Sequence, residues 1–373
     1  MLTLILKSTN ACNLRCAYCS LGDKTLTRTL SETEILRGLE WFAEYGKEKG
    51  EKTLSVIFHG GEPMMIPALQ YRRCIEQLLI KYPDISWQYY VQTNGTILEL
   101  DYIDLFKRYD IHVGISLDGP ERIHDTQRKT REGENTFGQI AENIICLKEN
   151  GVSVSALMVL TKAGLSEDLA YLERFCEIGL PLKINPLLNE GEARKHQELA
   201  LAPGNYGDYI KAVFDYVIDH EVDIRVSPLE DMLGAVLYGR RPRGCTFRKE
   251  CNDSFICVNQ CGDIYPCGRF ADVYSHKAGD IWRGISQEGQ QILKKLRQRR
   301  CVNLPEACLG CRYADLCSGG CGASAIDGPG GSKETVMCED YRRIFDYLYG
   351  DGMEKYRKYL LARKDSILQQ LQE

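Results

Sequence analysis

Short apolar runs alternate with stretches of helical periodicity through the first two thirds of the chain. The apolar runs predict six buried strands, over residues 3–9, 53–60, 87–95, 112–120, 153–161 and 181–188. Apolar residues spaced three or four apart predict a helix after each strand, over 31–50, 67–82, 137–151, 166–179 and 206–220, with a short one from 101. The helix at 31–50 opens with Ser31 and Glu34, which have the spacing of a capping box. This alternation predicts an α/β fold with a parallel sheet that is covered by helices.

Polar motifs follow four of the predicted strands. "HGGEP" (59–63) ends the second strand, "QTNG" (92–95) the third, "SLDGP" (116–120) the fourth and "NP" (185–186) the sixth. In barrels of parallel strands, the active site is built at the carboxyl ends of the strands. Because six strand–helix pairs are fewer than a closed barrel needs, we expect a partial (β/α)6 TIM-like barrel with its chemistry on this face.

The pattern changes after about residue 236, where short segments are punctuated by Gly and Cys. These segments have too few apolar runs to build a hydrophobic core alone, so a domain of this kind needs bound metal to stabilise its fold. A last helix is predicted over roughly 338–371. We therefore expect a barrel over 1–235, a cysteine-rich domain over 236–348 and a C-terminal helix over 349–373.

The composition is that of an ordinary globular protein, with 44% hydrophobic and 27% charged residues among 373. The net charge of −5 and the pI of about 5.8 give no electrostatic footprint for nucleic acid. The basic runs at 239–244 and 294–300 lie among acidic neighbours and predict solvated surface. Because no signal peptide and no membrane-spanning apolar stretch is visible, we expect no membrane partner and a cytoplasmic protein with reduced thiols.

The 17 cysteines are unusual for a reducing compartment, and they are unevenly placed. Three lie within 12–19, and the isolated Cys74, Cys146 and Cys176 lie on apolar faces of predicted helices, where we expect them in the core. The other 11 lie between 245 and 338. An odd total in a reducing compartment disfavours a disulfide framework and favours metal binding.

The first array, "CNLRCAYC", places Cys12, Cys16 and Cys19 directly after the first predicted strand. A structural zinc site needs four ligands and a disulfide needs two. A cubane iron–sulfur cluster binds one cysteine per iron, so three cysteines leave one iron open for a substrate or cosubstrate. The competing interpretation is a buried stripe on a helix, because the spacing i, i+4 and i+7 is also helical.

This array and the strand-end motifs together resemble the radical S-adenosylmethionine enzymes. The resemblance implies a [4Fe-4S] cluster on Cys12, Cys16 and Cys19 with S-adenosylmethionine at its open iron. It further implies that the GGE motif holds the methionine amino group. The cosubstrate site that the resemblance implies consists of Gly60, Gly61, Glu62, Thr93, Asn94, Ser116, Arg128 and Asn185. In such enzymes an electron from the cluster splits the sulfonium, and a 5′-deoxyadenosyl radical then takes a hydrogen atom from the substrate.

The second array, "CLGCRYADLCSGGC" (308–321), together with the upstream "GDIYPC" (262–267), resembles the SPASM extension of radical enzymes that modify peptides. The resemblance implies two auxiliary [4Fe-4S] clusters, three clusters in all. The ligands that it implies are Cys245, Cys251, Cys267 and Cys321 for the first auxiliary cluster and Cys308, Cys311, Cys317 and Cys338 for the second. Zinc is the alternative for 308–321, because paired cysteines also suit zinc.

Cys257, Cys261 and Cys301 are left without an assigned role. They are interpreted as structural thiols. Alternatively, Cys257 and Cys261 compete as ligands of the first auxiliary cluster, or one of the three thiols donates a hydrogen atom to a substrate radical.

The layout resembles the anaerobic sulfatase-maturating enzymes, which oxidise a Cys or Ser to formylglycine. Those enzymes carry an Asp after the "YPC" cysteine, a Tyr two residues after the third cluster cysteine and a Gln before GGEP. This chain has Gly268, Leu21 and His59 there, and glycine cannot act as a base. We therefore expect a SPASM maturase that abstracts hydrogen from a residue of a ribosomal precursor peptide or protein, giving a thioether or carbon–carbon cross-link. The alternatives are formylglycine formation and dehydrogenation of a small molecule.

No catalytic base stands out in the sequence. The candidates are His59, Asp118 and Arg269. Each also has a structural interpretation: His59 as a residue packed beneath the cosubstrate, Asp118 as a cap at the end of a strand, and Arg269 as a solvent-exposed side chain. The resemblance implies a peptide or protein substrate and an electron donor such as flavodoxin or ferredoxin. A non-catalytic iron–sulfur carrier is the competing class of protein, but a carrier has no use for the GGEP motif and an open iron.

Overall fold

The computed structural model describes residues 1–373 except 23–25, 243, 250, 272, 326–333 and 371–373, and it leaves out the side chains of 252, 300–301 and 364–370. The chain forms two compact units from interleaved segments. The first unit comprises Met1–Val159, Leu187–Ala200 and Glu250–Asn303, and the second comprises Leu160–Pro186, Leu201–Lys249 and Leu304–Glu373. The domain boundaries expected at 235 and 348 stay a prediction.

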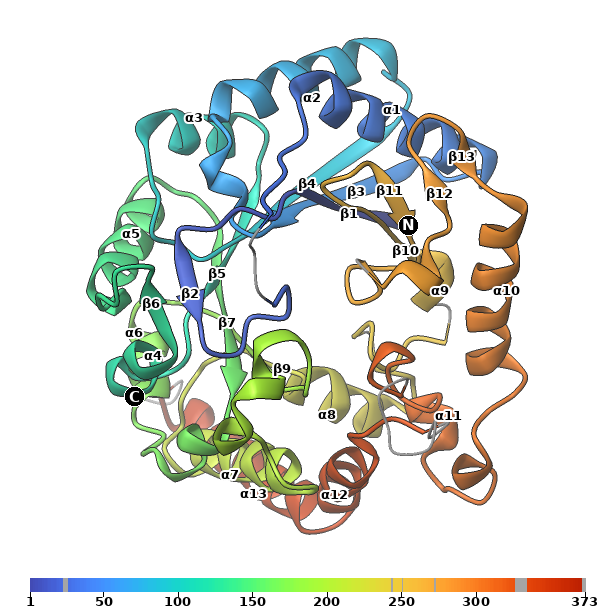
Figure 1. Cartoon of the computed structure of the whole chain (residues 1–373). Helices are drawn as coiled ribbons and strands as arrows, with labels where there is room; N and C mark the ends of the chain where they lie inside the picture. The colour runs from blue at the N-terminus through green and yellow to red at the C-terminus, as the bar shows by residue number, and fades with distance from the viewer. Residues whose placement is uncertain (23–25, 243, 250, 272, 326–333, 371–373) are drawn as a thin grey trace. The chain divides into compact units, whose positions relative to one another are not determined.

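The first unit is built on the parallel strands that the sequence predicts (Figure 1). They pair in the order β1 (Leu2–Thr9), β3 (Thr53–Gly60), β4 (Ser86–Thr93), β5 (His112–Ser116) and β7 (Val154–Leu160). Each of these neighbouring pairs is parallel. The α/β fold class is therefore confirmed, and the carboxyl ends of these strands lie at one edge of the sheet.

Four helices of this unit lie where the sequence predicts them: α1 (Glu32–Glu48), α2 (Ala68–Lys81), α3 (Leu100–Arg108) and α5 (Phe137–Glu149). The sequence analysis did not predict α4 (Glu121–Gln127), α9 (Cys251–Ser254) and α10 (Gln287–Cys301). Figure 1 shows α1, α2 and α3 outside the strands β1, β3 and β4. The capping box of α1 is confirmed, because the Ser31 hydroxyl accepts from the Glu34 amide and the Glu34 carboxylate accepts from the Ser31 amide.

The two faces of the central strands have different environments. Leu4, Leu6 and Val56 are fully buried, and the ring of Phe58 packs 4.6 Å from that of Tyr71 on α2. Because side chains alternate along a strand, the residues between them point to the opposite face. The sheet thus has a helix-covered face and a second face that leads to the strand-end motifs.

The sheet continues past β1 with strands that the sequence analysis did not predict. β10 (Phe255–Val258) pairs in parallel with β1, and β11 (Asp263–Tyr265), β12 (Gly279–Asp280) and β13 (Gly284–Ile285) follow in antiparallel order. The apolar run of β10 is only four residues long. A run this short does not distinguish a strand from a loop inside a cysteine-rich segment.

The second unit contains the sixth predicted strand, β8 (Leu182–Pro186), in parallel with β9 (Val226–Ser227). Its helices are α6 (Tyr171–Glu177), α7 (Asn205–Asp219), α8 (Leu229–Tyr238), α11 (Ala314–Cys317), α12 (Cys338–Tyr349) and α13 (Asp351–Gln370). Lys355 Nζ of α13 donates to Asp215 Oδ1 of α7 at 2.8 Å, and Asp340 Oδ1 of α12 accepts from the Gly207 amide at 2.9 Å. These polar contacts fasten α12 and α13 onto α7.

Two predicted helices differ from the structure. The single helix expected over 338–371 is wrong, because Gly350 (φ −111°, ψ −117°) separates α12 from α13. Glycine is a poor helix former, so ending the helix at this position costs little free energy. The helix expected over 166–179 begins only at Tyr171. There the Asp168 carboxylate accepts from the Ala170 amide at 3.1 Å, a local bond that competes with helix formation.

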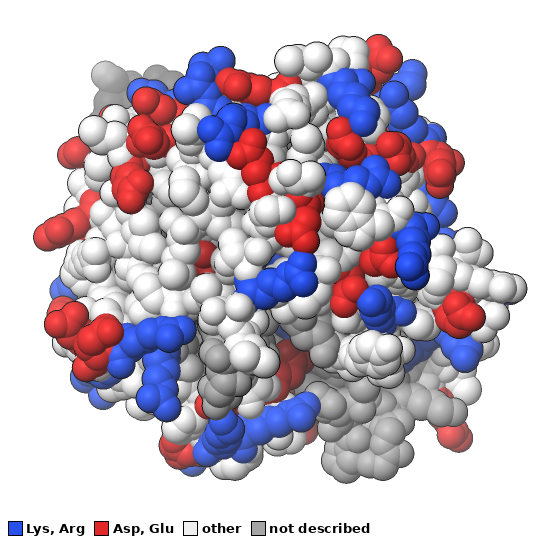
Figure 2. Space-filling view, turned by 45° about the horizontal axis from the view of Figure 1, so that its top comes forward, with Lys and Arg blue, Asp and Glu red and all other residues white. Residues whose placement is uncertain are grey.

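Two surface properties bear on the expected partners. None of the helices in the part of the chain that the structure describes is long and apolar enough to cross a membrane. Figure 2 shows acidic and basic side chains intermixed on one face of the molecule.

Candidate functional site

The three cysteines of the first array lie on a loop that contains one short strand. β2 (Leu14–Cys16) pairs in antiparallel with β6 (Arg128–Thr130), so that Cys16 lies opposite Arg128. Cys12 precedes this strand and is buried, whereas Cys16 and Cys19 are half-buried. The competing interpretation as a helix stripe is therefore wrong.

Segments distant in sequence hold this cysteine loop in shape. Arg131 Nε donates to the carbonyl of Cys12 at 2.9 Å, and the Glu192 amide donates to the carbonyl of Cys19 at 2.9 Å. Gly191, with φ +54°, approaches so closely that a Cβ there would lie 2.2 Å from the Cys19 carbonyl oxygen. These contacts fix the backbone of the loop at both its first and its last cysteine.

The thiols of the loop have the surroundings of cluster ligands. Cys12 Sγ accepts from the Leu14 amide at 3.4 Å and from Asn94 Nδ2 at 3.7 Å. Hydrogen bonds to sulfur are one of the features that set the reduction potential of an iron–sulfur cluster. Burial raises the pKa of Cys16 to about 11, and the Arg128 guanidinium opposes this rise. Because thiols lose their protons when they bind iron, this cation favours the ligated form of Cys16.

No group of three or more His, Cys, Asp and Glu side chains within the described ranges is arranged to hold a metal ion. A cubane attaches each cysteine to a different iron, so its ligands stand further apart than those of a single ion. The donor set of Cys12, Cys16 and Cys19 fits a cubane with one open iron.

A buried polar network surrounds Tyr18, which lies between the second and third cysteines. The Tyr18 hydroxyl donates to Asp118 Oδ2 and accepts from Arg128 Nη1, the latter at 2.7 Å. The second oxygen of Asp118 accepts from the Val159 amide at 3.0 Å. The three side chains are 9% or less exposed. Burial raises the pKa of Asp118, and the positive charge of Arg128 opposes this rise. Asp118 thus fits the strand-end cap interpretation.

One atom of this network points to a ligand. Arg128 Nε is buried and has no hydrogen-bond partner among the described residues. Leaving a buried guanidinium N–H unpaired is costly, so such an atom indicates an acceptor that binds there. A carboxylate is the acceptor that a guanidinium prefers. Arg128 therefore fits its predicted role at the carboxylate end of S-adenosylmethionine.

Glu62 of the GGEP motif is fully buried and ties its loop to the end of β4. One carboxylate oxygen accepts from the Met64 amide at 3.0 Å and from Thr93 Oγ1 at 2.7 Å, and the other accepts from the Asn94 amide at 2.7 Å. Burial raises the pKa of Glu62, and these donors oppose the rise. The Glu62 side chain therefore shapes the motif, and the Gly61 and Glu62 amides fix it further by donating to the carbonyls of Thr9 and Ala11.

The two glycines of the motif are required for close approach to the cysteine loop. A Cβ on Gly60, whose φ is +149°, would lie 2.2 Å from the Thr9 carbonyl oxygen. A Cβ on Gly61 would lie 2.1 Å from the Ala11 carbonyl oxygen. No other residue fits at these positions without moving the backbone.

The remaining predicted cosubstrate residues lie at strand ends. Asn94 Nδ2 also donates to Asn13 Oδ1 at 2.8 Å, so that Asn94 links β4 to the cysteine loop. Ser116 Oγ, at the end of β5, accepts from Gln92 Nε2 at 3.2 Å. Asn185 lies on β8 in the second unit. The cosubstrate role of these residues stays a prediction.

The candidate catalytic residues have different surroundings. His59 lies at the end of β3, and its Nδ1 accepts a hydrogen bond from the Gly60 amide at 2.7 Å. This agrees with the interpretation of His59 as a residue that is bonded to the backbone. Its neighbour across the strands in register is Lys7 of β1, whose side chain is only 7% exposed. Arg269 Nη1 lies 3.8 Å from Glu190 Oε1, and the Arg269 side chain is 38% exposed. The sequence analysis did not single out Lys7; its signal is a Lys on the inward side of an apolar strand.

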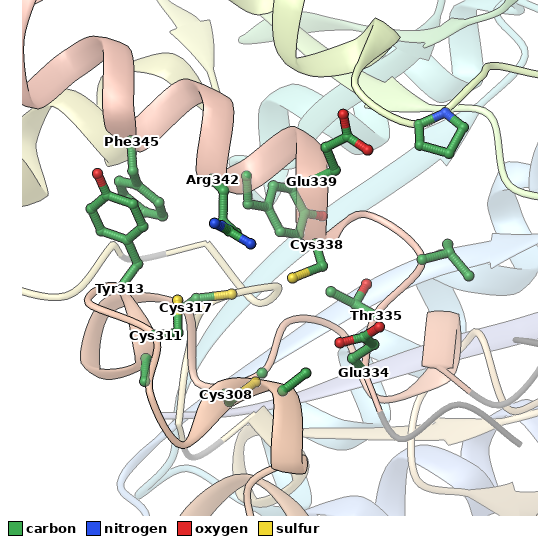
Figure 3. Close-up of a pocket in the computed structure, with 16 residues that line it drawn as sticks. Cys308, Cys311, Tyr313, Cys317, Glu334, Thr335, Cys338, Glu339, Arg342 and Phe345 are labelled. Carbon is green, nitrogen blue, oxygen red and sulfur yellow. The ribbon is translucent and has the colours of Figure 1, made fainter.

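The second cysteine set lines one cavity. Cys308, Cys311, Cys317 and Cys338 surround a space of about 580 Å³ in the second unit. Figure 3 shows these cysteines around the space: Cys308 and Cys311 come from the segment before α11, Cys317 from the end of α11 and Cys338 from the start of α12, with Arg342 and Glu334 nearby. Burial raises the pKa of Cys338, as do Glu334 and Cys311, whereas Arg342 lowers it. Four thiols around one cavity fit the predicted second auxiliary cluster.

The cysteines of the first auxiliary set are divided between the two units. Cys251 and Cys267 belong to the first unit and Cys245 and Cys321 to the second, so this ligand set stays a prediction. Cys257 is fully buried on β10 and Cys261 is exposed.

The isolated cysteines and Cys301 complete the inventory of thiols. Of the isolated cysteines, Cys74 is buried as expected, but Cys146 and Cys176 are only half-buried. Cys301 ends α10, and its side chain lies outside the described residues.

His124 of α4 makes the region around Asp118 sensitive to acid. Its Nδ1 accepts from the Asp118 amide at 3.2 Å, and its Nε2 lies 3.0 Å from Thr136 Oγ1. Burial, with the Arg128 charge, lowers the pKa of His124 from 6.5 to about 3. Below pH ~6.5, His124 is therefore protonated in the unfolded chain but stays neutral in the folded chain.

We expect the wild-type protein to lose free energy of unfolding from His124 as the pH falls from 6.5 towards 3, by up to ~1.4 kcal/mol per pH unit. His124→Gln should be less stable at pH 7 but should show a shallower loss between these pH values. Urea unfolding at several pH values measures both slopes. Equal slopes in the two proteins would show that His124 is protonated as easily in the folded state as in the unfolded one.

Comparison with known proteins gives one family and several full-length relatives. Residues 6–192 match the model of the Radical SAM superfamily. A cysteine-type anaerobic sulfatase-maturating enzyme of Clostridium novyi is 27% identical over 356 residues, which cover 92% of this chain and 94% of the relative.

Two solved structures with peptides share the fold. Native anSMEcpe with bound AdoMet and Cp18Cys peptide has a TM-score of 0.80 at 22% identity, covering 95% of this chain and 98% of that chain. Streptococcus suis SuiB bound to precursor peptide SuiA has a TM-score of 0.62 at 17% identity, covering 90% of this chain and 76% of that chain. At these identities the structural similarity concerns the fold.

Proposed function

The chain belongs to the Radical SAM superfamily, and on this premise we propose that it removes a hydrogen atom from a residue of a peptide or protein substrate. The observation that carries the proposal is the loop of Cys12, Cys16 and Cys19, held beside a buried arginine with an unpaired N–H. Three thiols supply an incomplete ligand set, and the arginine supplies a binding site for a carboxylate. Together they match one cluster and one amino-acid-like cosubstrate.

Different residues of the first unit would bind the cluster and the cosubstrate. Cys12, Cys16 and Cys19 would hold the [4Fe-4S] cluster, and Arg128 would bind the carboxylate of S-adenosylmethionine. When bound, cluster and cosubstrate supply an electron and then a radical that takes hydrogen from an unactivated C–H bond. The backbone carbonyls of Gly60 and Gly61 would meet the methionine amino group, since the amides of both glycines and the Glu62 carboxylate are already engaged within the protein.

We also propose two auxiliary [4Fe-4S] clusters on the cysteine sets predicted above, which bring the total to three. The cavity lined by Cys308, Cys311, Cys317 and Cys338 supports the second of them. Anaerobic reconstitution should then give about 12 iron atoms per chain, four for each cubane. Because each reaction cycle starts with an electron, a donor such as flavodoxin or ferredoxin is part of the proposal.

The comparisons favour sulfatase-type maturation over the cross-linking reaction that we expect from the sequence alone. Relatives named as anaerobic sulfatase-maturating enzymes match over almost the whole chain. The fold similarity to native anSMEcpe is also higher than that to SuiB. We therefore propose oxidation of a Cys or Ser in a protein substrate as the first candidate reaction.

Peptide cross-linking is the second candidate, and the residue after Cys267 favours it. Gly268 cannot remove a proton from a substrate thiol or hydroxyl, which oxidation to an aldehyde requires. A cross-link formed at a carbon radical has no such requirement for a base at this position. His59 and Leu21 also differ from the sulfatase-maturating pattern.

The experiment that tests the proposal measures S-adenosylmethionine cleavage and the fate of peptides together. Dithionite-reduced, reconstituted protein should form 5′-deoxyadenosine. With a C-x-P-x-R peptide, the first candidate predicts a product that reacts with hydrazine, as a carbonyl does; the second predicts loss of two hydrogens and no carbonyl. Protein with full cluster content that forms no 5′-deoxyadenosine contradicts both candidates.

A further inference from the structure

We propose that the buried charges of Arg128 and Asp118 set the reduction potential of the radical cluster, which Arg128 raises and Asp118 lowers. The radical cluster is the [4Fe-4S] cluster proposed above on the first cysteine array. This inference rests on the proposed function, because it concerns the cluster of that reaction. It gives Arg128 a second role, beside binding the cosubstrate carboxylate, and gives Asp118 a role beyond that of a strand-end cap.

Arg128 faces one of the proposed cluster ligands from the neighbouring strand. It lies directly opposite Cys16 in the antiparallel pair of β2 and β6. Side chains that are directly opposite in such a pair lie on the same side of it, with their Cβ atoms about 4.5–5.5 Å apart. The Arg128 side chain is only 7% exposed. It therefore starts beside Cys16 and remains inside the protein.

Tyr18 holds the guanidinium group of Arg128 against the cysteine loop. Arg128 Nη1 donates to the Tyr18 hydroxyl at 2.7 Å, and Arg128 Cζ lies 5.9 Å from the centroid of the Tyr18 ring. Tyr18 is part of the loop, between Cys16 and Cys19. Because both ends of the arginine side chain are placed beside this loop, its positive charge is fixed there. The Nε atom remains for the carboxylate of the cosubstrate.

Asp118 brings a negative charge into the same network. Its Oδ2 accepts from the Tyr18 hydroxyl, and its Oδ1 accepts from the Val159 amide at 3.0 Å. Both oxygens therefore act as acceptors, as they do in an ionised carboxylate. The side chain is fully buried, and buried charges are screened much less than exposed ones. Asp118 reaches the loop through Tyr18, so we expect a smaller effect from it than from Arg128.

The two charges act on the step in which the radical cluster is reduced. The cluster takes up one electron, which the donor loses, and no other bond forms or breaks in this step. Its negative charge therefore increases. A buried cation nearby stabilises the reduced form and a buried anion destabilises it, because charges interact strongly in a medium of low dielectric constant. Net charge and solvent exposure are among the features that set the potential of an iron–sulfur cluster.

Redox titration of the reconstituted protein without S-adenosylmethionine, followed by electron paramagnetic resonance, tests this inference. Cys16→Ala gives the signals of the auxiliary clusters, which are subtracted. At a fixed potential, Arg128→Met should lower the ratio of reduced to oxidised radical cluster at least ~10-fold, a shift of ~59 mV to more negative potential. Arg128→Lys should stay within ~3-fold of the wild-type ratio, since lysine keeps the charge. Asp118→Asn should raise the ratio by ~3-fold or more.

The matched control is Arg15→Met. Arg15 precedes Cys16 on β2, but its side chain is exposed and points to the opposite side of the strand. Because exposed charges contribute little, the ratio should stay within ~2-fold of the wild-type value.

The outcomes separate this inference from the proposed function. A wild-type potential in Arg128→Met overturns the inference and leaves Arg128 with cosubstrate binding alone. If Arg128→Met assembles no radical cluster, Asp118→Asn decides, and a potential at or below the wild-type value in that variant overturns the inference. A wild-type protein whose signals equal those of Cys16→Ala holds no radical cluster, which removes the proposed function itself.

Discussion

Replacement of Cys16 by alanine is expected to lower S-adenosylmethionine cleavage by at least ~1,000-fold, because a cluster that loses one of three ligands cannot be held with a single open iron. Cys16 lies opposite Arg128 at the end of β2, between two ligands that the same loop positions. No neighbouring cysteine of the loop can take its place, since Cys12 and Cys19 are both needed. Production of 5′-deoxyadenosine under dithionite measures the loss.

The control for this variant is Cys74→Ala, which removes a buried thiol of α2 far from the loop in sequence. It should be less stable but should keep cleavage and iron. Cys16→Ala should keep the iron of the auxiliary clusters, about 8 atoms per chain. If Cys16→Ala still cleaved S-adenosylmethionine at the wild-type rate, the assignment of the loop would be wrong.

Arg128→Gln is expected to weaken S-adenosylmethionine binding by roughly 30-fold or more, which corresponds to the cost of removing one buried charged partner. The buried Arg128 binds the Tyr18 hydroxyl and faces Asp118 and Cys16. Its loss leaves Asp118 without its counter-charge, so the free energy of unfolding should also fall by about 3 kcal/mol. Isothermal titration of the reconstituted protein and urea unfolding measure the two effects.

Arg128→Lys distinguishes binding from folding. Lysine keeps the positive charge near Asp118 but loses the Nε donor and the planar geometry. We expect most of the stability to return while the affinity for S-adenosylmethionine stays low. Arg108→Gln, an exposed arginine of α3, should change neither quantity. Wild-type affinity in Arg128→Lys would show that the Nε donor is not used.

The strands and the first cysteine array could be read from the sequence because each is encoded locally. A strand buried on both faces forms a continuous apolar run, as β1 does, whereas β4 alternates buried with less buried positions, as a half-buried strand does. The family resemblance rests on motifs at the ends of these strands, and the comparisons confirm it. β10 could not be predicted from its local sequence, because the strand with which it pairs, β1, lies some 250 residues away in the chain.

The buried network around Tyr18 could not be derived from the sequence. Its members Tyr18, Asp118 and Arg128 come from three segments, and each is a polar residue that is usually found at the surface. Only the fold brings them together and buries them. The same holds for Lys7, which looks like an interruption of an apolar run until the register places it beside His59.

The most direct test of the central claim is electron–nuclear double resonance on the reduced protein with S-adenosylmethionine labelled with ¹⁵N at its amino group. If Cys12, Cys16 and Cys19 leave one iron open to the cosubstrate, the spectrum should show ¹⁵N coupling to the cluster in the wild-type protein and none in Cys16→Ala. A wild-type protein that binds the labelled compound without any such coupling would contradict the account.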